Sequence, residues 1–376
     1  SIPSRQPYWP VCAIISTASL CVRGNNICDT SINNKLESEI ELSTLKRTAP
    51  KQLVMFSPSG ALVDETLLDR ACSHLSAQHG FSVTEMPEAR LRVQRFAGNE
   101  SERITSIENA FAINTPSLLM ATRGGYGLSR LLPQLNFPKL ASLLNSNAHQ
   151  LCGHSDITSL QLALLNAGAK PFTLLHGPMA CFDFGAEQGA DPVTVEHFLR
   201  AVNKQAVDIQ WPVEGFGFCK QQNIEGQVWG GNLTLLCSLL GTPWLPNIPG
   251  GILVLEDVNE PAYKIERMLL QLLHAGVLAT QQAILLGNFS EPQPGIHDNG
   301  FSLRSAAEFV QSELRNQLSG ETGTTLKQIP VLMNFPFGHC TPKACWFQGG
   351  QGSLTIGPST AAPSELRARL IQNLQQ

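Results

Sequence analysis

The chain has 376 residues, a length that suits two domains of ordinary size. Only 15% of the residues are charged and the formal net charge is −4, so the chain lacks the basic excess that nucleic-acid binding requires. Apolar residues make up 43%, a proportion that excludes disorder over the bulk of the chain.

Residues 1–50 predict a poorly ordered leader, because residues 25–50 are polar, mixed in charge and without a clear period. The apolar run Val11–Val22 is shorter than the roughly 20 residues that cross a bilayer. A signal peptide core can be that short, but Leu20 precedes Cys21 where a lipoprotein signal has a small residue. We therefore expect no membrane segment, with a removed signal peptide as the alternative.

The ten cysteines include no C-x-x-C pair, and most of them lie in apolar or helical stretches. Free cysteine behaves as a small apolar residue in such places. This usage favours a reducing, cytoplasmic location over a disulfide framework.

Short apolar runs alternate with segments of helical period in the first half of the chain. Strands are expected at Leu53–Phe56 and Phe81–Val83, and in the runs SLLMATRGGYG, LCGHSDIT and FTLLHGPM. Helices are expected at Val63–His79, Asn99–Asn114 and Leu128–Leu135, and after the GHSDIT turn. This alternation is typical of parallel β-α-β units, so we predict a Rossmann-like N-terminal domain over residues 51–190.

The second half predicts an α/β or β-rich C-terminal domain over residues 225–376, after a connection at residues 191–224. Its clearest elements are strands at Ile252–Leu255 and Ala283–Leu286, a helix at Ala262–His274 and an antiparallel hairpin at Lys343–Ile356. The predicted fold class is therefore two-domain α/β.

Two turns of the first half carry candidate chemistry. GHSDIT puts Ser155 at a sharp strand-to-helix turn, which exposes its Oγ beside the free N–H groups of a helix start. Alternatively, Ser155 or Asp156 simply caps that helix. The turn Thr122–Gly127, TRGGYG, fits a phosphate cradle, a backbone donor loop for an oxyanion, or a tight turn with positive φ.

Carboxylates follow a buried strand in LEDVNEP. Glu256 comes directly after four apolar residues, and a carboxylate in that place is costly without a partner. Asp257 and Glu260 are expected to be solvated turn residues. Ligands of open α/β sheets bind at such strand ends, which makes Glu256 the strongest candidate.

Three histidines compete as general bases. His339 ends an apolar strand in FPFGHC, His154 precedes Ser155, and His176 lies in LLHGPM. A structural histidine is the alternative for each, and neighbours such as His154 and Ser155 usually point apart. No H-x-x-x-H spacing occurs, so we expect no metal site.

Six motifs follow one another in order: ATRGGYGLSRLLPQLNF, GHSDITSLQLAL, HGPM, GGNLTLLCSLLGTPWLP, LEDVNEPAYKIERML and FPFGH. In this succession the chain resembles the LD-carboxypeptidase family of serine peptidases, whose type members are the muramoyltetrapeptide carboxypeptidases. RFAGNESERITSIENAF is also similar to an early helix of that family. The likeness spans residues 51–357.

The resemblance implies a Ser–His–Glu triad shared by two α/β domains, with Ser155 as nucleophile, Glu256 as acid and His339 as base. These roles agree with elementary chemistry, because a serine hydroxyl needs a base near pH 7 and a carboxylate fixes the tautomer of that base. The implied oxyanion donors are Gly125, Asp156 and, as a second choice, Gly124. The family association implies no cofactor and a homodimer.

The implied activity is hydrolysis of the amide bond between the L-centre of a diamino acid and a terminal D-alanine in a murein tetrapeptide, in cell-wall recycling. Backbone N–H groups or an arginine must bind the terminal carboxylate. Arg123 and Arg130 stand near the right turns, with a surface or packing role as the equal alternative. Asn232, in GGN, is expected to line the cleft as an amide donor.

Three other functions stay open. A related immunity peptidase would cleave a peptidyl-nucleotide antibiotic and stack its base on Trp229 or Trp244, although both favour the core. A non-catalytic protein would bind muropeptides without turnover. A nucleotide-dependent ligase would place ATP on the Gly-rich turn.

Overall fold

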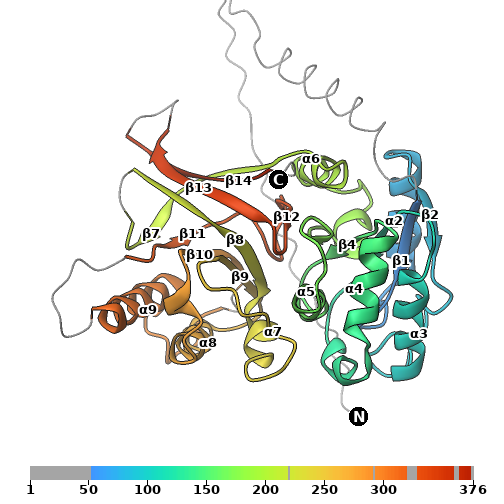
Figure 1. Cartoon of the computed structure of the whole chain (residues 1–376), viewed down its shortest axis with the longest axis horizontal. Helices are drawn as coiled ribbons and strands as arrows, with labels where there is room; N and C mark the ends of the chain where they lie inside the picture. Colours follow the sequence, from blue (N-terminus) through green and yellow to red (C-terminus); the bar gives the residue numbers. More distant parts are fainter. Residues whose placement is uncertain (1–51, 219–220, 291–292, 320–327, 360–363, 374–376) are drawn as a thin grey trace, which may run out of the picture. The chain divides into compact units, whose positions relative to one another are not determined.

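Two β-sheets organise the part of the chain that the structure describes (Figure 1). This computed structural model describes residues 52–218, 221–290, 293–319, 328–359 and 364–373. The predicted leader, residues 1–50, lies outside the described residues. The described residues fall within one compact unit, Leu42–Gln376.

The first sheet has six strands in the order β12-β5-β4-β3-β1-β2, and all of them except β12 run parallel. The parallel strands are β1 (Gln52–Phe56), β2 (Ser82–Glu85), β3 (Ser117–Ala121), β4 (Gln150–Gly153) and β5 (Leu174–His176). Their order is that of a doubly wound sheet, in which ligands bind at the carboxyl ends of the strands. The predicted Rossmann-like layer is confirmed.

Helices cover both faces of this sheet, which explains why its central strands β1 and β3 are apolar and buried at every position after the first residue. Val54 and Phe56 on β1 share one apolar cluster with Ile107 and Leu160, whereas Leu53 and Met55 face the other cluster. The helices on the first face are α3 (Glu100–Phe111), α4 (Phe137–Ser146) and α5 (Ile157–Asn166). Those on the second face are α2 (Glu65–Ala77) and a π-helical turn, η3 (Ala180–Phe184).

The second sheet has eight strands in the order β6-β14-β13-β8-β9-β10-β11-β7. Four adjacent strands are parallel: β8 (Gln222–Asn232), β9 (Ile252–Val258), β10 (Ala283–Ser290) and β11 (Val331–Met333). The antiparallel ones are β6 (Val207–Pro212), β7 (Glu214–Phe216), β13 (Gln351–Pro358) and β14 (Leu366–Gln372). The associated helices are α6 (Pro192–Val202), α7 (Leu233–Ser238), α8 (Ala262–His274), η4 (Leu278–Thr280) and α9 (Leu303–Leu318).

The α/β class with two sheets is confirmed, and some predicted elements differ. The helix expected at Leu128–Leu135 is two 3-10 turns, η1 (Leu128–Arg130) and η2 (Leu132–Gln134), the second with a proline in its first turn. The segment 191–224, expected as a connection, contributes α6, β6, β7 and the start of β8. The domain boundaries themselves stay a prediction.

The hairpin expected at Lys343–Ile356 is wrong. Its first arm, β12 (Trp346–Phe347), pairs with β5 in the first sheet, whereas β13 pairs with β8 and β14 in the second. The arms part at Gln348, whose side-chain amide bonds the N–H and the carbonyl oxygen of Gly230. This crossing joins the two sheets between β5 and β8.

No helix in the described ranges has both the length and the apolar character of a membrane span. The six cysteines among these residues are free thiols.

Candidate active site

Ser155 lies on a strained elbow between β4 and α5. Its φ is +62°, in the left-handed region that costs energy for any residue with a Cβ. Asp156 begins α5 without a side-chain capping bond, and its Oδ2 instead accepts from the N–H of Leu128 at 3.0 Å. Within the described chain the Ser155 hydroxyl has no hydrogen-bond partner, so it does not serve as a cap.

The Gly-rich turn after β3 packs directly on this elbow. A Cβ on Gly124 would lie 2.9 Å from Ser155 Cβ and 3.0 Å from its Oγ, so only glycine allows the approach. The carbonyl oxygen of Gly124 accepts from Gly60 N at 3.2 Å, which ties the turn to the loop after β1. Gly125 follows with a φ of +105°. The peptide units of this turn thus pass beside the Ser155 hydroxyl.

The second sheet supplies an imidazole and a carboxylate in contact. Glu256 is fully buried on β9, and its Oε2 lies 2.8 Å from Nδ1 of His339, which follows β11. Because a carboxylate only accepts, Nδ1 carries the proton and Nε2 remains as the acceptor. Gly338 lets the two side chains meet, since a Cβ there would lie 3.0 Å from Glu256 Cβ.

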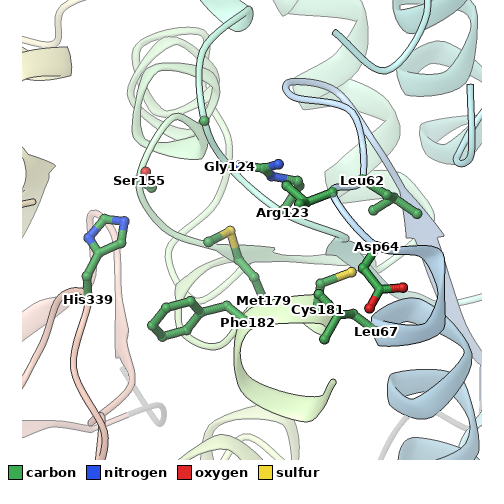
Figure 2. Close-up of a pocket in the computed structure, with 12 residues that line it drawn as sticks. Leu62, Asp64, Leu67, Arg123, Gly124, Ser155, Met179, Cys181, Phe182 and His339 are labelled. Atoms are coloured by element: carbon green, nitrogen blue, oxygen red, sulfur yellow. The ribbon is translucent and has the colours of Figure 1, made fainter. Parts of the chain in front are cut away.

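These parts surround one cavity of about 210 Å³ (Figure 2). Ser155 and His339 both line it, and Figure 2 shows their side chains at the same side of the cavity. No hydrogen bond joins Ser155 Oγ to His339 within the described chain. The described residues include no group of three side chains able to hold a metal ion.

Comparison with known proteins identifies the family. Residues 54–176 match the LD-carboxypeptidase N-terminal domain and residues 225–354 match the LD-carboxypeptidase C-terminal domain. The murein tetrapeptide carboxypeptidase of Pseudomonas aeruginosa is 28% identical over 79% of this chain and 91% of its own length. The muramoyltetrapeptide carboxypeptidase structure from Oxalobacter formigenes is 34% identical, with a TM-score of 0.70 over 85% of this chain and 98% of its own.

This chain belongs to the LD-carboxypeptidase family. A structure of the protein MccF in complex with glutamyl sulfamoyl guanosine shares the fold as well, with a TM-score of 0.68 at 22% identity over 87% of this chain and 98% of its own. The family membership makes the chain a peptidase.

Asn232 lies behind the carboxylate of Glu256 and does not line the cavity. Its Nδ2 donates to Glu256 Oε1 at 3.2 Å and to Asp257 Oδ1 at 3.0 Å. The solvated role expected for Asp257 is wrong, because it is only 4% exposed and accepts from the N–H and hydroxyl of Thr234. Burial raises the pKa of Asp257. Glu260, by contrast, is part-exposed and pairs with Lys264 at 3.5 Å.

The two other candidate histidines do not line the cavity. Nδ1 of His154 lies 3.0 Å from the carbonyl oxygen of Gly177, and its Nε2 lies 3.4 Å from Nζ of Lys343. Burial and the Lys343 cation hold the pKa of His154 well below its ordinary value. His176 stacks on Trp346 at 4.2 Å, and burial lowers its pKa to about 3. Of the three, His339 alone meets both a carboxylate and the cavity.

A buried ion pair supports the site, and the sequence analysis missed it. Lys343 Nζ lies 2.9 Å from Asp183 Oδ1, with both side chains almost fully buried. Asp183 also accepts from Met179 N at 2.8 Å, and the His154 ring that contacts Lys343 lies 5.0 Å from the His339 ring. The available signal was a single lysine in the apolar stretch TPKACWF, where a charge needs a buried partner.

Proposed function

We propose that this chain is a serine carboxypeptidase that hydrolyses the amide bond between a diamino acid and a terminal D-alanine in murein tetrapeptides. The observation that carries the proposal is the Glu256–His339 hydrogen bond, at a cavity that also contains the unpartnered hydroxyl of Ser155. The activities for which the Pseudomonas aeruginosa and Oxalobacter formigenes relatives are named support the murein substrate.

In this mechanism His339 Nε2 takes the proton of Ser155 as Oγ attacks the scissile carbonyl carbon. Glu256 holds the imidazole by its Nδ1 and stabilises the imidazolium that forms. The imidazolium then gives the proton to the nitrogen of the departing D-alanine. Water, activated by the same imidazole, hydrolyses the acyl-enzyme. Catalytic hydrogen bonds commonly tighten when substrate binds, so the open Ser155–His339 pair is compatible with this role.

The oxyanion of the tetrahedral intermediate takes its hydrogen bonds from backbone N–H groups of Gly125 and Asp156, with Gly124 as the second choice. The close approach of Gly124 to Ser155 supports this arrangement, because a substrate carbonyl attacked by Oγ would lie beside the turn. One such donor stabilises a transition state by roughly 3 kcal/mol.

The immunity-peptidase alternative has less support. MccF complexes with aminoacyl sulfamoyl nucleosides share the fold at 21–22% identity. Neither tryptophan expected to stack on the nucleobase of the antibiotic, Trp229 or Trp244, lines the cavity. Trp229 is only 1% exposed and donates a hydrogen bond to Gln281. The murein peptide therefore remains the favoured substrate.

Mass spectrometry of peptide digests tests the proposal. Wild-type protein is incubated with matched tetrapeptides that end in an LD-linked or a DD-linked D-alanine, and with an aminoacyl nucleotide. We expect release of D-alanine from the LD form only, and none with S155A. Turnover of the nucleotide conjugate alone would favour the immunity activity, and binding of the tetrapeptide without turnover would establish the non-catalytic alternative. The homodimer and the cytoplasmic location stay predictions.

A further inference from the structure

A carboxypeptidase must hold a charged group one residue beyond the bond that it cleaves. Within the proposed function, the terminal carboxylate therefore needs a cationic or multiple N–H partner close to Ser155. Arg123 is the only basic side chain among the described residues that line the cavity, apart from the imidazole of His339 (Figure 2). The question is whether its guanidinium is free to bind.

Three other cations near the site are already engaged. Arg130 pairs with Glu100 at 2.7 Å and lies over the ring of Phe96. Arg103 is buried and donates to the carbonyl oxygens of Pro58 and Gly127. Lys343 is committed to Asp183. These partners leave none of the three available to a ligand in the cavity.

Arg123 keeps most of its donors. Its Nη1 donates to the carbonyl oxygen of Ala61 at 2.8 Å, and no described carboxylate forms an ion pair with it. Nε and Nη2, which form the edge of the guanidinium suited to a bidentate carboxylate, have no hydrogen bond in the described chain. Burial lowers the pKa of Arg123, yet arginine stays charged at neutral pH, so the site holds an unpaired, half-buried cation.

The Ser155 hydroxyl and the Arg123 guanidinium border successive residues of one turn. A Cβ on Gly124 would lie 3.0 Å from Ser155 Oγ, and a Cβ on the next residue, Gly125, would lie 3.5 Å from Nη2 of Arg123. The scissile carbonyl and the terminal carboxylate of a peptide likewise belong to successive residues, whose Cα atoms are about 3.8 Å apart.

The surrounding wall fits a small residue between these two groups. Leu62, Leu67 and Met179 give the cavity an apolar side that suits the methyl group of alanine. The one carboxylate on the lining, Asp64, is held at the start of α2, where it accepts from the N–H and the hydroxyl of Thr66. Those bonds lower its pKa and orient it toward the helix.

We propose that the Arg123 guanidinium binds the terminal carboxylate of the peptide and so sets the preceding amide bond over Ser155. This contact makes the enzyme act on the last residue of a chain, because an internal bond offers no carboxylate at that distance. Arg123 is thus a specificity-determining residue for the proposed reaction.

The test compares two substrates that differ only at this group: an LD tetrapeptide with a free terminal carboxylate and the same peptide with a terminal carboxamide. For wild type we expect a kcat/KM about 100-fold higher for the acid, since charge-assisted bidentate bonds are lost in the amide. In R123M the kcat/KM values for the two substrates should agree within about threefold, because only the value for the acid falls. R130M, the matched control, should keep the wild-type ratio.

Each outcome decides the question. The proposal is overturned if R123M keeps the wild-type acid-to-amide ratio, whether neither substrate loses activity or both lose it equally. If R123M does not fold, R123K decides instead, because it keeps the charge but loses the fork, and the ratio should fall about tenfold. Wild-type protein that releases neither D-alanine from the acid nor D-alaninamide from the amide would contradict the proposed function itself, a result distinct from any failure of Arg123.

Discussion

The two halves of the site are built in different ways. On the first sheet, Ser155 and Gly124 follow adjacent strands, β4 and β3, and their positions come from backbone conformation: a left-handed elbow and a close glycine contact. On the second sheet, Glu256 and His339 lie 83 positions apart in sequence and meet through a buried hydrogen bond. The position of Ser155 thus depends on local geometry, and the contact of Glu256 with His339 depends on tertiary packing.

This difference shows where each half is vulnerable. Beside Ser155 a Cβ added at Gly124 is a steric problem, because it would lie 2.9 Å from Ser155 Cβ. Around Glu256 the problem is electrostatic, since its carboxylate is fully buried and is held by Asn232 on one oxygen and His339 on the other. Substitutions that act on one kind of support and spare the other can therefore separate the two halves.

The largest effect is expected for E256Q. Glutamine keeps the size of the side chain but presents an NH₂ group to the imidazole, which disfavours the tautomer that leaves Nε2 free. We expect kcat to fall by about 10⁴-fold with little change in folding. Steady-state kinetics on an LD tetrapeptide measure this, with E225Q on the exposed face of β8 as the control. A loss of less than tenfold would contradict the role of Glu256 as the acid.

A smaller effect is expected for K343M, and on stability first. The substitution leaves Asp183 buried without its cation, which should lower the free energy of unfolding by about 3–5 kcal/mol. The double variant K343M/D183L removes both charges and should recover most of that loss. Urea denaturation of the two variants measures the difference. Equal destabilisation of both would show that the ion pair contributes through packing alone.

The same variant has a predictable pH dependence. Burial raises the pKa of Asp183 above its ordinary 3.8, and the Lys343 cation opposes that rise. Without the cation the folded carboxyl binds its proton more tightly than the unfolded one does. Stability of K343M should therefore improve as pH falls from neutral toward about 4, where the unfolded carboxyl also becomes protonated. Unfolding midpoints measured across that range check the sign.

Sequence patterns predicted the features that depend on neighbouring residues. The apolar strands of the first sheet, the helix Ala262–His274 and the elbow at Ser155 are all visible in local periodicity and turn composition. The same patterns failed where a residue or strand pairs with a distant segment of the chain. Asp257 was expected in solvent because its partner Thr234 lies 23 positions away, and β12 left its expected hairpin to pair with β5.

Local sequence patterns also did not predict which side chains can donate hydrogen bonds in the cavity. Arg123 and Arg130 were equal candidates in sequence, and the structure separates them, because Arg123 lines the cavity and Arg130 pairs with Glu100. Asn232 was expected in the cleft, but its amide is consumed by two buried carboxylates. Long-range polar pairing leaves no periodic signal, since each partner satisfies the other wherever the fold brings them together.

The smallest predicted effect is that of G124A, and it isolates the backbone half of the site. An alanine Cβ would lie 2.9 Å from Ser155 Cβ and 3.4 Å from the backbone N of Asp156, so the elbow or the turn must move by a few tenths of an ångström or more. Displacements of up to about 1 Å at reacting atoms cost up to about 100-fold in rate, so we expect kcat to fall roughly 10- to 100-fold. KM for the acid substrate should change little, because Arg123 is unaltered.

The matched control is G357A. Gly357, on β13, has open space around a Cβ and no positive φ. Alanine there should keep kcat and KM within about a factor of two of wild type. The free energy of unfolding should stay within about 0.5 kcal/mol of wild type, as for other surface substitutions. If G124A behaves like G357A, the close packing of the turn on Ser155 has no catalytic consequence. If G124A instead raises KM alone, the turn binds substrate without positioning the nucleophile, and the division between a steric half and an electrostatic half of the site fails.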